Sequence, residues 1–247
     1  MGTWVERIDD EVNLPTLRFG NLRCVALSDA ARRSVNESGK TLLQRNADSL
    51  RDFAYITDRA ITTPTLEALS SRYLTRFYLR APITEDAVRC LSSVIRQAVG
   101  LEEFLLNAIS IETPLAPVFL EAPSGALPNL REFAFMAYTE TPYTDLFPAV
   151  VGFLRGRTKL RKLTLIVDLP EAEVADAGYG ASTWGLLPSL PHLTALAMTF
   201  PPDLAPGLAS WVLPRGLRAL ALNGNWAIFT PNFLSVSPRV PRTFLPS

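Results

Sequence analysis

LREFAF, which runs from Leu130 to Phe135, is one of eight copies of the hexamer that decides the fold. Every copy begins with leucine and has apolar residues at its fourth and sixth positions. The copies are LRCVAL at Leu22, LRDFAY at Leu50, LTRFYL at Leu74, LEEFLL at Leu101, LREFAF at Leu130, LRKLTL at Leu160, LTALAM at Leu193 and LRALAL at Leu217. Their first leucines follow one another at an average interval of about 28 residues, which indicates a repeat architecture.

Each hexamer is expected to form a short strand. Side chains of a strand alternate between its two faces, so the fourth and sixth positions are buried while the third, fifth and seventh face outward. A strand this short cannot bury one face alone, but copies stacked in parallel share a continuous core. The pattern therefore predicts an α/β solenoid, with a curved parallel sheet on the concave side and short helices and extended segments on the convex side.

The segments between the hexamers differ in character. Residues 84–98 are predicted to be a helix, because Thr84 can cap it and the apolar residues form one stripe. A second helix is expected at 145–154, ending near Gly156. Four prolines within 113–128 favour an extended chain or a brief 3₁₀ turn there. The glycines within 170–189 predict a mobile surface loop.

One domain accounts for the whole chain in this interpretation. Residues 1–13, which contain the capping box Thr3-x-x-Glu6, are expected to be an amphipathic helix that caps the first strand. Residues 14–225 hold the eight irregular repeats. Residues 226–247 are interpreted as a degenerate, truncated ninth repeat, because proline replaces its leading leucine.

The hexamers, with the Leu-Pro-x-Leu sequences at Leu127–Leu130 and Leu190–Leu193, resemble the leucine-rich-repeat superfamily. Over about residues 14–225, the irregular spacing and proline-rich lead-ins are most similar to the repeat half of fungal F-box proteins. That resemblance implies substrate recognition for ubiquitin ligases. The F-box itself, a helical module that docks the ligase adaptor, is expected to be absent, since too few residues precede Leu22 to form it.

The family has a ladder position, usually Asn or Cys, that follows each strand. Here it is met by Asn225, with Asp58 and Asp168 as possible substitutes. Buried asparagine ladders are therefore not expected to hold this array together.

Outward positions at the centre of the array predict a binding site. In the fifth-position column the side chains are small except for Tyr78 and Leu105, which lie on adjacent repeats. The outward residues nearby are Arg76, Arg80, Glu103 and Met136. Aromatic, arginine and aliphatic side chains are typical of interface centres, so we expect these six residues to bind a protein partner on the concave face. The alternative is an ordinary solvated sheet surface.

The third-position column has mostly alternating charges between neighbouring strands. It reads Cys24, Asp52, Arg76, Glu103, Glu132, Lys162, Ala195 and Ala219. Such a column is expected to form a ladder of cross-strand ion pairs, each worth only about 0.2 to 1 kcal/mol.

Composition excludes several classes of partner. The chain of 247 residues has 24 Lys and Arg against 24 Asp and Glu, so no net charge favours nucleic acid or an anionic membrane. The first residues lack the basic segment and long apolar core of a secretory signal, and no apolar run reaches membrane-spanning length, so neither a signal nor a membrane span is expected. Cys24 and Cys90 lack metal-ligand spacing and are expected to be free thiols, which favours the cytoplasm or nucleus.

No catalytic or cofactor motif occurs in the sequence. The single histidine, His192, lies in a Leu-Pro-His-Leu lead-in and is expected to be a turn residue rather than a catalytic base. We expect no catalytic residues, metal, cofactor or small-molecule substrate. The sequence predicts a non-catalytic protein-binding module, with a truncated structural fragment of a longer F-box-like protein as the alternative.

Overall fold

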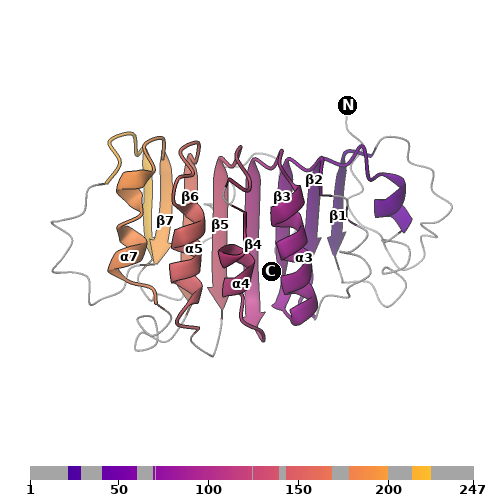
Figure 1. Cartoon of the computed structure of the whole chain (residues 1–247), viewed down its shortest axis with the longest axis horizontal. Helices are drawn as coiled ribbons and strands as arrows, with labels where there is room; N and C mark the ends of the chain where they lie inside the picture. Colours follow the sequence, from indigo (N-terminus) through magenta and orange to yellow (C-terminus); the bar gives the residue numbers. More distant parts are fainter. Residues whose placement is uncertain are drawn as a thin grey trace, which may run out of the picture.

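The computed structural model describes residues 22–28, 41–59, 69, 71–123, 125–138, 143–168, 178–199 and 213–223. They form an α/β structure with one open, eight-stranded parallel sheet whose strands follow the order of the chain. The strands are β1 (Cys24–Ser28), β2 (Asp52–Ile56), β3 (Arg76–Ile83), β4 (Glu103–Ile111), β5 (Glu132–Tyr138), β6 (Lys162–Asp168), β7 (Ala195–Thr199) and β8 (Ala219–Asn223). Helices α3, α4, α5 and α7 all lie against one face of this sheet (Figure 1).

The eight hexamers are eight neighbouring strands, as the repeat pattern predicts. Every strand begins at the third residue of its hexamer, and these third residues pair in register from Cys24 to Ala219. The parallel sheet is therefore confirmed, together with the alignment of equivalent positions into columns across it.

A stack of phenylalanine rings lies beneath strands β2 to β5. Phe53, Phe77, Phe104 and Phe133 occupy the fourth position of successive hexamers, and their ring centroids are 5.9, 5.6 and 5.8 Å apart. All four are at most 2% exposed. Because fourth and sixth positions point to the helix-covered face, they form one continuous core with the apolar residues of the helices.

Main-chain hydrogen bonds join each repeat to the next at the edge where the strands begin. The carbonyl oxygen of the second hexamer residue accepts from the N–H groups of the second and third residues of the following hexamer. The carbonyl of Arg131, for example, accepts from Arg161 at 2.7 Å and from Lys162 at 3.0 Å. This arrangement recurs at all seven junctions, so the repeats start at equivalent heights.

Two predicted helices are confirmed. Helix α3 spans Glu85–Gln97, and the hydroxyl of Thr84 accepts from the N–H of Ala87 at 3.5 Å as its cap. Helix α5 spans Leu146–Leu154 and is followed by Gly156, whose φ of +85° is readily adopted by glycine.

The proline-rich segment was expected to be extended or 3₁₀, and that expectation is wrong for part of it. Residues Ala116–Leu120 form the short helix α4, with Pro117 in its first turn. Proline is tolerated there because the first N–H groups of a helix have no partner within the helix. Burial of Val118 and Phe119 against the core stabilises this turn.

The second half of the glycine-rich segment is also more ordered than predicted. Helix α7 spans Ala181–Trp184, and a 3₁₀ turn follows at Leu187–Ser189. Tyr179 is 1% exposed, and its hydroxyl donates to the carbonyl of Thr199 at 2.7 Å. This hydrogen bond between distant parts of the chain orders the segment, although its glycines favour flexibility.

Several expectations lie outside the described residues. These are the capping helix at 1–13, the ninth repeat at 226–247, residues 170–177 of the predicted loop and the ladder residue Asn225. The two possible ladder substitutes, Asp58 and Asp168, are both exposed, so neither forms a buried ladder.

Candidate functional site

The register brings most of the predicted patch together on the face opposite the helices. Arg76 lies opposite Glu103, and Tyr78 lies opposite Leu105, on strands β3 and β4. Arg80 lies opposite Asn107, which in turn lies opposite Met136 on β5. We call this face the open face, because α3, α4, α5 and α7 lie on the other side (Figure 1).

Burial divides the patch into two parts. Arg76, Tyr78, Arg80, Glu103 and Leu105 are half-buried, so each presents part of its side chain to solvent. Met136 is only 5% exposed, and Ala134 and Ile166 beside it are 4% exposed. A ligand can therefore contact the β3 and β4 residues directly, whereas Met136 offers it almost no surface.

Tyr78 is the largest of these half-buried side chains. Burial raises the pKa of its hydroxyl, while the charge of Arg80 and a hydrogen bond from Asn107 lower it. The net shift is upward, so the phenol stays protonated at neutral pH. The side-chain oxygen of Asn107 is buried and has no donor among the described residues. The site thus combines an aromatic ring, a guanidinium and a spare acceptor.

The predicted ion ladder forms in part. Arg76 binds Asp52 through two hydrogen bonds, one of them 2.8 Å from Nε to Oδ1. Lys162 donates to Glu132 at 2.8 Å, and outside the column Arg80 pairs with Asp58 at 3.2 Å. Glu103 lies between Arg76 and Glu132 in the column, so it has one neighbour of each sign.

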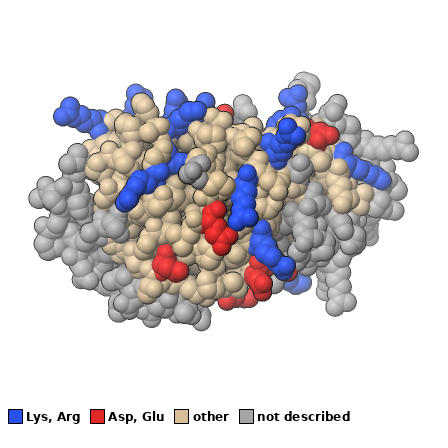
Figure 2. Space-filling model, viewed as in Figure 1, with Lys and Arg blue, Asp and Glu red and all other residues tan. Residues whose placement is uncertain are grey.

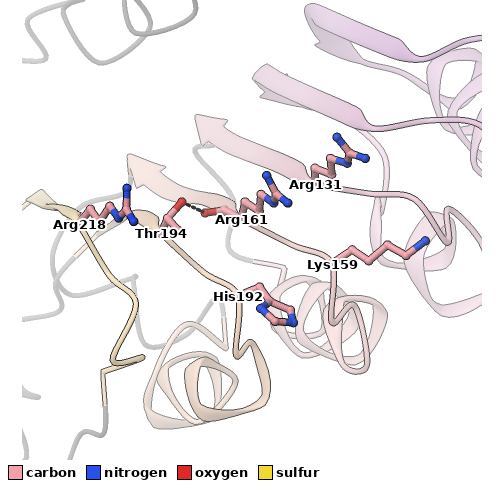
Figure 3. A pocket seen from close by; sticks show the side chains of 6 residues that line it. All are labelled: Arg131, Lys159, Arg161, His192, Thr194 and Arg218. Atoms are coloured by element: carbon pink, nitrogen blue, oxygen red, sulfur yellow. Dashed lines mark hydrogen bonds between the residues drawn. The ribbon is translucent and has the colours of Figure 1, made fainter.

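A second surface lies at the edge where β5, β6, β7 and β8 begin. It is a hollow of about 650 Å³ lined by Arg131, Lys159, Arg161, His192, Thr194 and Arg218, and we call it the edge hollow (Figure 3). The space-filling view shows Lys and Arg gathered along this edge of the sheet (Figure 2). All its lining residues except Thr194 are exposed.

The edge hollow was not predicted from the sequence. Arg131, Arg161, Thr194 and Arg218 are the second residues of their hexamers, and Lys159 and His192 immediately precede a leading leucine. The signal was visible as a second-position column with five arginines in eight: Arg23, Arg51, Thr75, Glu102, Arg131, Arg161, Thr194 and Arg218. That column lies just before the strands begin, so it is not among the outward strand positions from which the open-face patch was predicted. His192 itself lies in a turn, as expected.

Over the described ranges, no group of three or more His, Cys, Asp or Glu is placed to hold a metal ion. Neither Cys24 nor Cys90 forms a disulfide bond within the described part of the chain. No helix in the described part of the chain has the length and apolar character needed to cross a bilayer. Comparison with models of known protein families, and with curated proteins, gives no match for this chain.

Proposed function

We propose that this chain is a leucine-rich-repeat solenoid that binds a protein partner, without catalysis, on its open face. The observation that carries the proposal is the cluster of Tyr78, Leu105 and Arg80 on the face that the described helices leave free. In a leucine-rich-repeat solenoid this face is the concave one, which partners commonly use.

The physical character of the cluster supports this function. Tyr78 and Leu105 are neighbours in register and both keep part of their apolar surface in water. Arg76 and Arg80 flank Tyr78 and are held by ion pairs to Asp52 and Asp58, so their positions are set before a partner arrives. A fixed aromatic ring between ordered arginines loses little conformational entropy on binding, which is the usual property of an interface hot spot.

The likeness of the repeats to those of fungal F-box proteins extends the proposal to a biological role. The partner would be a protein selected for ubiquitin ligation, and the chain would act in the cytoplasm or nucleus. This role rests on the sequence resemblance alone.

The test is to isolate a partner by pull-down with the full chain, purify it and measure its Kd. The double variant Tyr78→Ala/Arg80→Ala is expected to weaken binding by more than about 2 kcal/mol, since both residues are proposed hot spots. The matched control is Arg96→Ala, because Arg96 lies on α3 and forms an exposed ion pair with Glu121 at 3.0 Å on the other face.

An unchanged Kd for the Tyr78/Arg80 variant, with the fold retained by circular dichroism, rejects the open-face site. An equal loss in the Arg96 variant also rejects it, because the partner would then contact the helix-covered face.

A further inference from the structure

The edge hollow has a strong local excess of positive charge in a chain whose formal net charge is zero. Four of its six lining residues are cationic, and none is acidic: Arg131, Lys159, Arg161 and Arg218. These cations lie where β5, β6 and β8 begin, and the residues from the start of β7, His192 and Thr194, lie among them (Figure 3).

These cations are poorly compensated by neighbouring acids. Arg131 reaches Glu102 at 3.5 Å in an exposed pair, and Lys159 donates to the neutral side chain of Asn129 at 2.8 Å. Among the described residues, no acid pairs with Arg161 or Arg218. On the open face, by contrast, Arg76, Arg80 and Lys162 each have an acidic partner. A bound anion would therefore face several cations in the hollow whose charge is not already balanced by an acid.

Main-chain contacts fix the spacing of this cationic row. The carbonyl of Arg161 accepts from Thr194 N–H at 2.8 Å, and the carbonyl of Thr194 accepts from Arg218 N–H at 2.8 Å. Neighbouring strands lie about 4.8 Å apart, so Arg131 and Arg161 are one spacing apart and Arg218 is two spacings further. Long arginine side chains can converge over such distances on one small anion.

Guanidinium groups match the geometry of a phosphate better than that of most other anions. Each can donate two parallel hydrogen bonds to a pair of phosphate oxygens, and several can share one group. A phosphomonoester also carries nearly two negative charges at neutral pH, which suits several uncompensated cations better than a single carboxylate does.

We propose that the edge hollow binds a phosphomonoester carried by a segment of a partner protein. The next residues of the second-position column beyond Arg131 are Glu102 and Thr75. The cationic row therefore ends there, whereas a nucleic-acid strand requires a continuous cationic track and stacking aromatic rings. The hollow has neither, so a single phosphorylated side chain fits it better.

The inference extends the proposed function by giving the protein partner a second contact, but the hollow can be tested separately. The probe is a fluorescein-labelled peptide library with a central phosphoserine and randomised neighbours, titrated with the full chain by fluorescence anisotropy. The same library with unmodified serine, inorganic phosphate as competitor, and a single-stranded DNA of about 20 nucleotides form the other arms.

The phosphoserine library is expected to bind and the serine library not to bind. The variant Arg161→Ala/Arg218→Ala should reduce that affinity at least tenfold, because charge-assisted hydrogen bonds are lost. Both residues are exposed, so the variant is expected to fold, and circular dichroism verifies this. The control Arg59→Ala removes an exposed arginine just after β2, at the opposite edge, and should leave binding unchanged.

Retained binding in the Tyr78→Ala/Arg80→Ala variant supports a site separate from the open face, even if the open-face proposal fails. Four results overturn the inference: equal binding of both libraries, unchanged affinity in the Arg161/Arg218 variant, tighter binding of the DNA than of the phosphopeptides, or displacement by inorganic phosphate at concentrations equal to the peptide. The last result would identify free phosphate as the ligand.

Discussion

Glu103 lies directly opposite Glu132 in the register of strands β4 and β5. Burial raises the pKa of Glu103 most, and the negative charge of Glu132 raises it further, while Arg76 and Lys162 oppose the shift. The net pKa lies above its ordinary value, so the ionised form of Glu103 is less favourable in the folded protein than in the unfolded chain.

The variant Glu103→Gln is therefore expected to have a higher Tm than the wild type at pH 7. An acid with a raised folded pKa costs stability when ionised, and this cost disappears as the pH falls through the folded pKa towards the unfolded value. The gain in Tm should accordingly shrink as the pH falls towards the ordinary pKa of Glu and be lost below about pH 4. Thermal unfolding followed by circular dichroism from pH 3 to 7 measures it. Glu112→Gln, at an exposed site just after β4, is the control, and a lower Tm for Glu103→Gln at pH 7 contradicts the prediction.

The phenylalanine stack is expected to contribute strongly to stability. Phe104 is fully buried between Phe77 and Phe133, so Phe104→Ala removes contacts on both sides and leaves a cavity. It should lower the free energy of unfolding by about 3–5 kcal/mol in urea titrations. Phe104→Leu should cost clearly less, because Leu163 and Leu196 already occupy the equivalent position on β6 and β7. Leu120→Ala, at a side chain 64% exposed, serves as the control, and an equal loss there would refute the role of the stack.

Gly178 is expected to tolerate no side chain. Its φ is +71°, and a Cβ atom would lie 2.4 Å from the carbonyl oxygen of Thr144 and 2.8 Å from Cδ of Pro148. Gly178→Ala should therefore destabilise the protein by at least about 1–3 kcal/mol. Gly152→Ala is the matched control with the opposite sign, because Gly152 lies inside α5 with nothing within 4 Å of its added Cβ. Alanine there should stabilise by about 0.5–1 kcal/mol. Similar Tm values for the two variants would contradict this assignment.

Cys24 is expected to be an unreactive thiol. Burial, and then the charge of Asp52, raise its pKa to about 11, against a lowering effect of Arg76. At pH 8 its alkylation by iodoacetamide should be about a hundredfold slower in the folded protein than in urea, since the thiolate is the reacting form. Mass spectrometry of the peptide containing Cys24 gives the rate at each pH. A rate that stops rising below pH 9 would show that the thiol is not protected in this way.

Sequence periodicity was sufficient to predict the sheet. The leading leucines and the apolar fourth and sixth positions are local signals, and every strand begins two residues after its leucine. Helix α3 was also predicted correctly, because Thr84 and the apolar stripe lie within one continuous segment. Each of these predictions depends on residues that are close together in the chain.

The errors arose where distant residues determine the structure. Helix α4 was not predicted, because its segment is rich in prolines. Its packing places the ring centroid of Phe119 5.5 Å from that of Phe153. The ordered structure around Tyr179 was not predicted, because the glycines there favour a mobile loop. The hydroxyl of Tyr179 donates a hydrogen bond to the carbonyl of Thr199, which is 20 residues further along the chain. Burial of Asn46, which accepts from the N–H of Leu22 at 3.2 Å, has no local signature either.

In the candidate sites too, features set by the repeat pattern were predicted, whereas features set by distant residues were not. Pairing of Tyr78 with Leu105 followed from the register, because both occupy the fifth position of their hexamers. Burial of Met136 did not, since its position in the column is that of an outward residue. The edge hollow required three-dimensional information, because Lys159 and His192 come from different repeats. That no acid among the described residues pairs with Arg161 is likewise a property of the folded surface.

The main-chain junctions between repeats have a consequence for how this protein can change. Carbonyl and N–H groups join successive hexamers at 2.7 to 3.1 Å at all seven junctions, and the hydroxyls of Thr75 and Thr194 add a side-chain bond at two of them. The main-chain bonds form with Arg, Thr or Glu at the second position, so no particular side chain there is needed to set the spacing of the strands. Single substitutions in the second-position column can therefore alter the charge pattern at the edge where the strands begin, while the sheet keeps its shape. The ligand preference of this edge can thus change through single substitutions, in evolution or by engineering, without a change of fold.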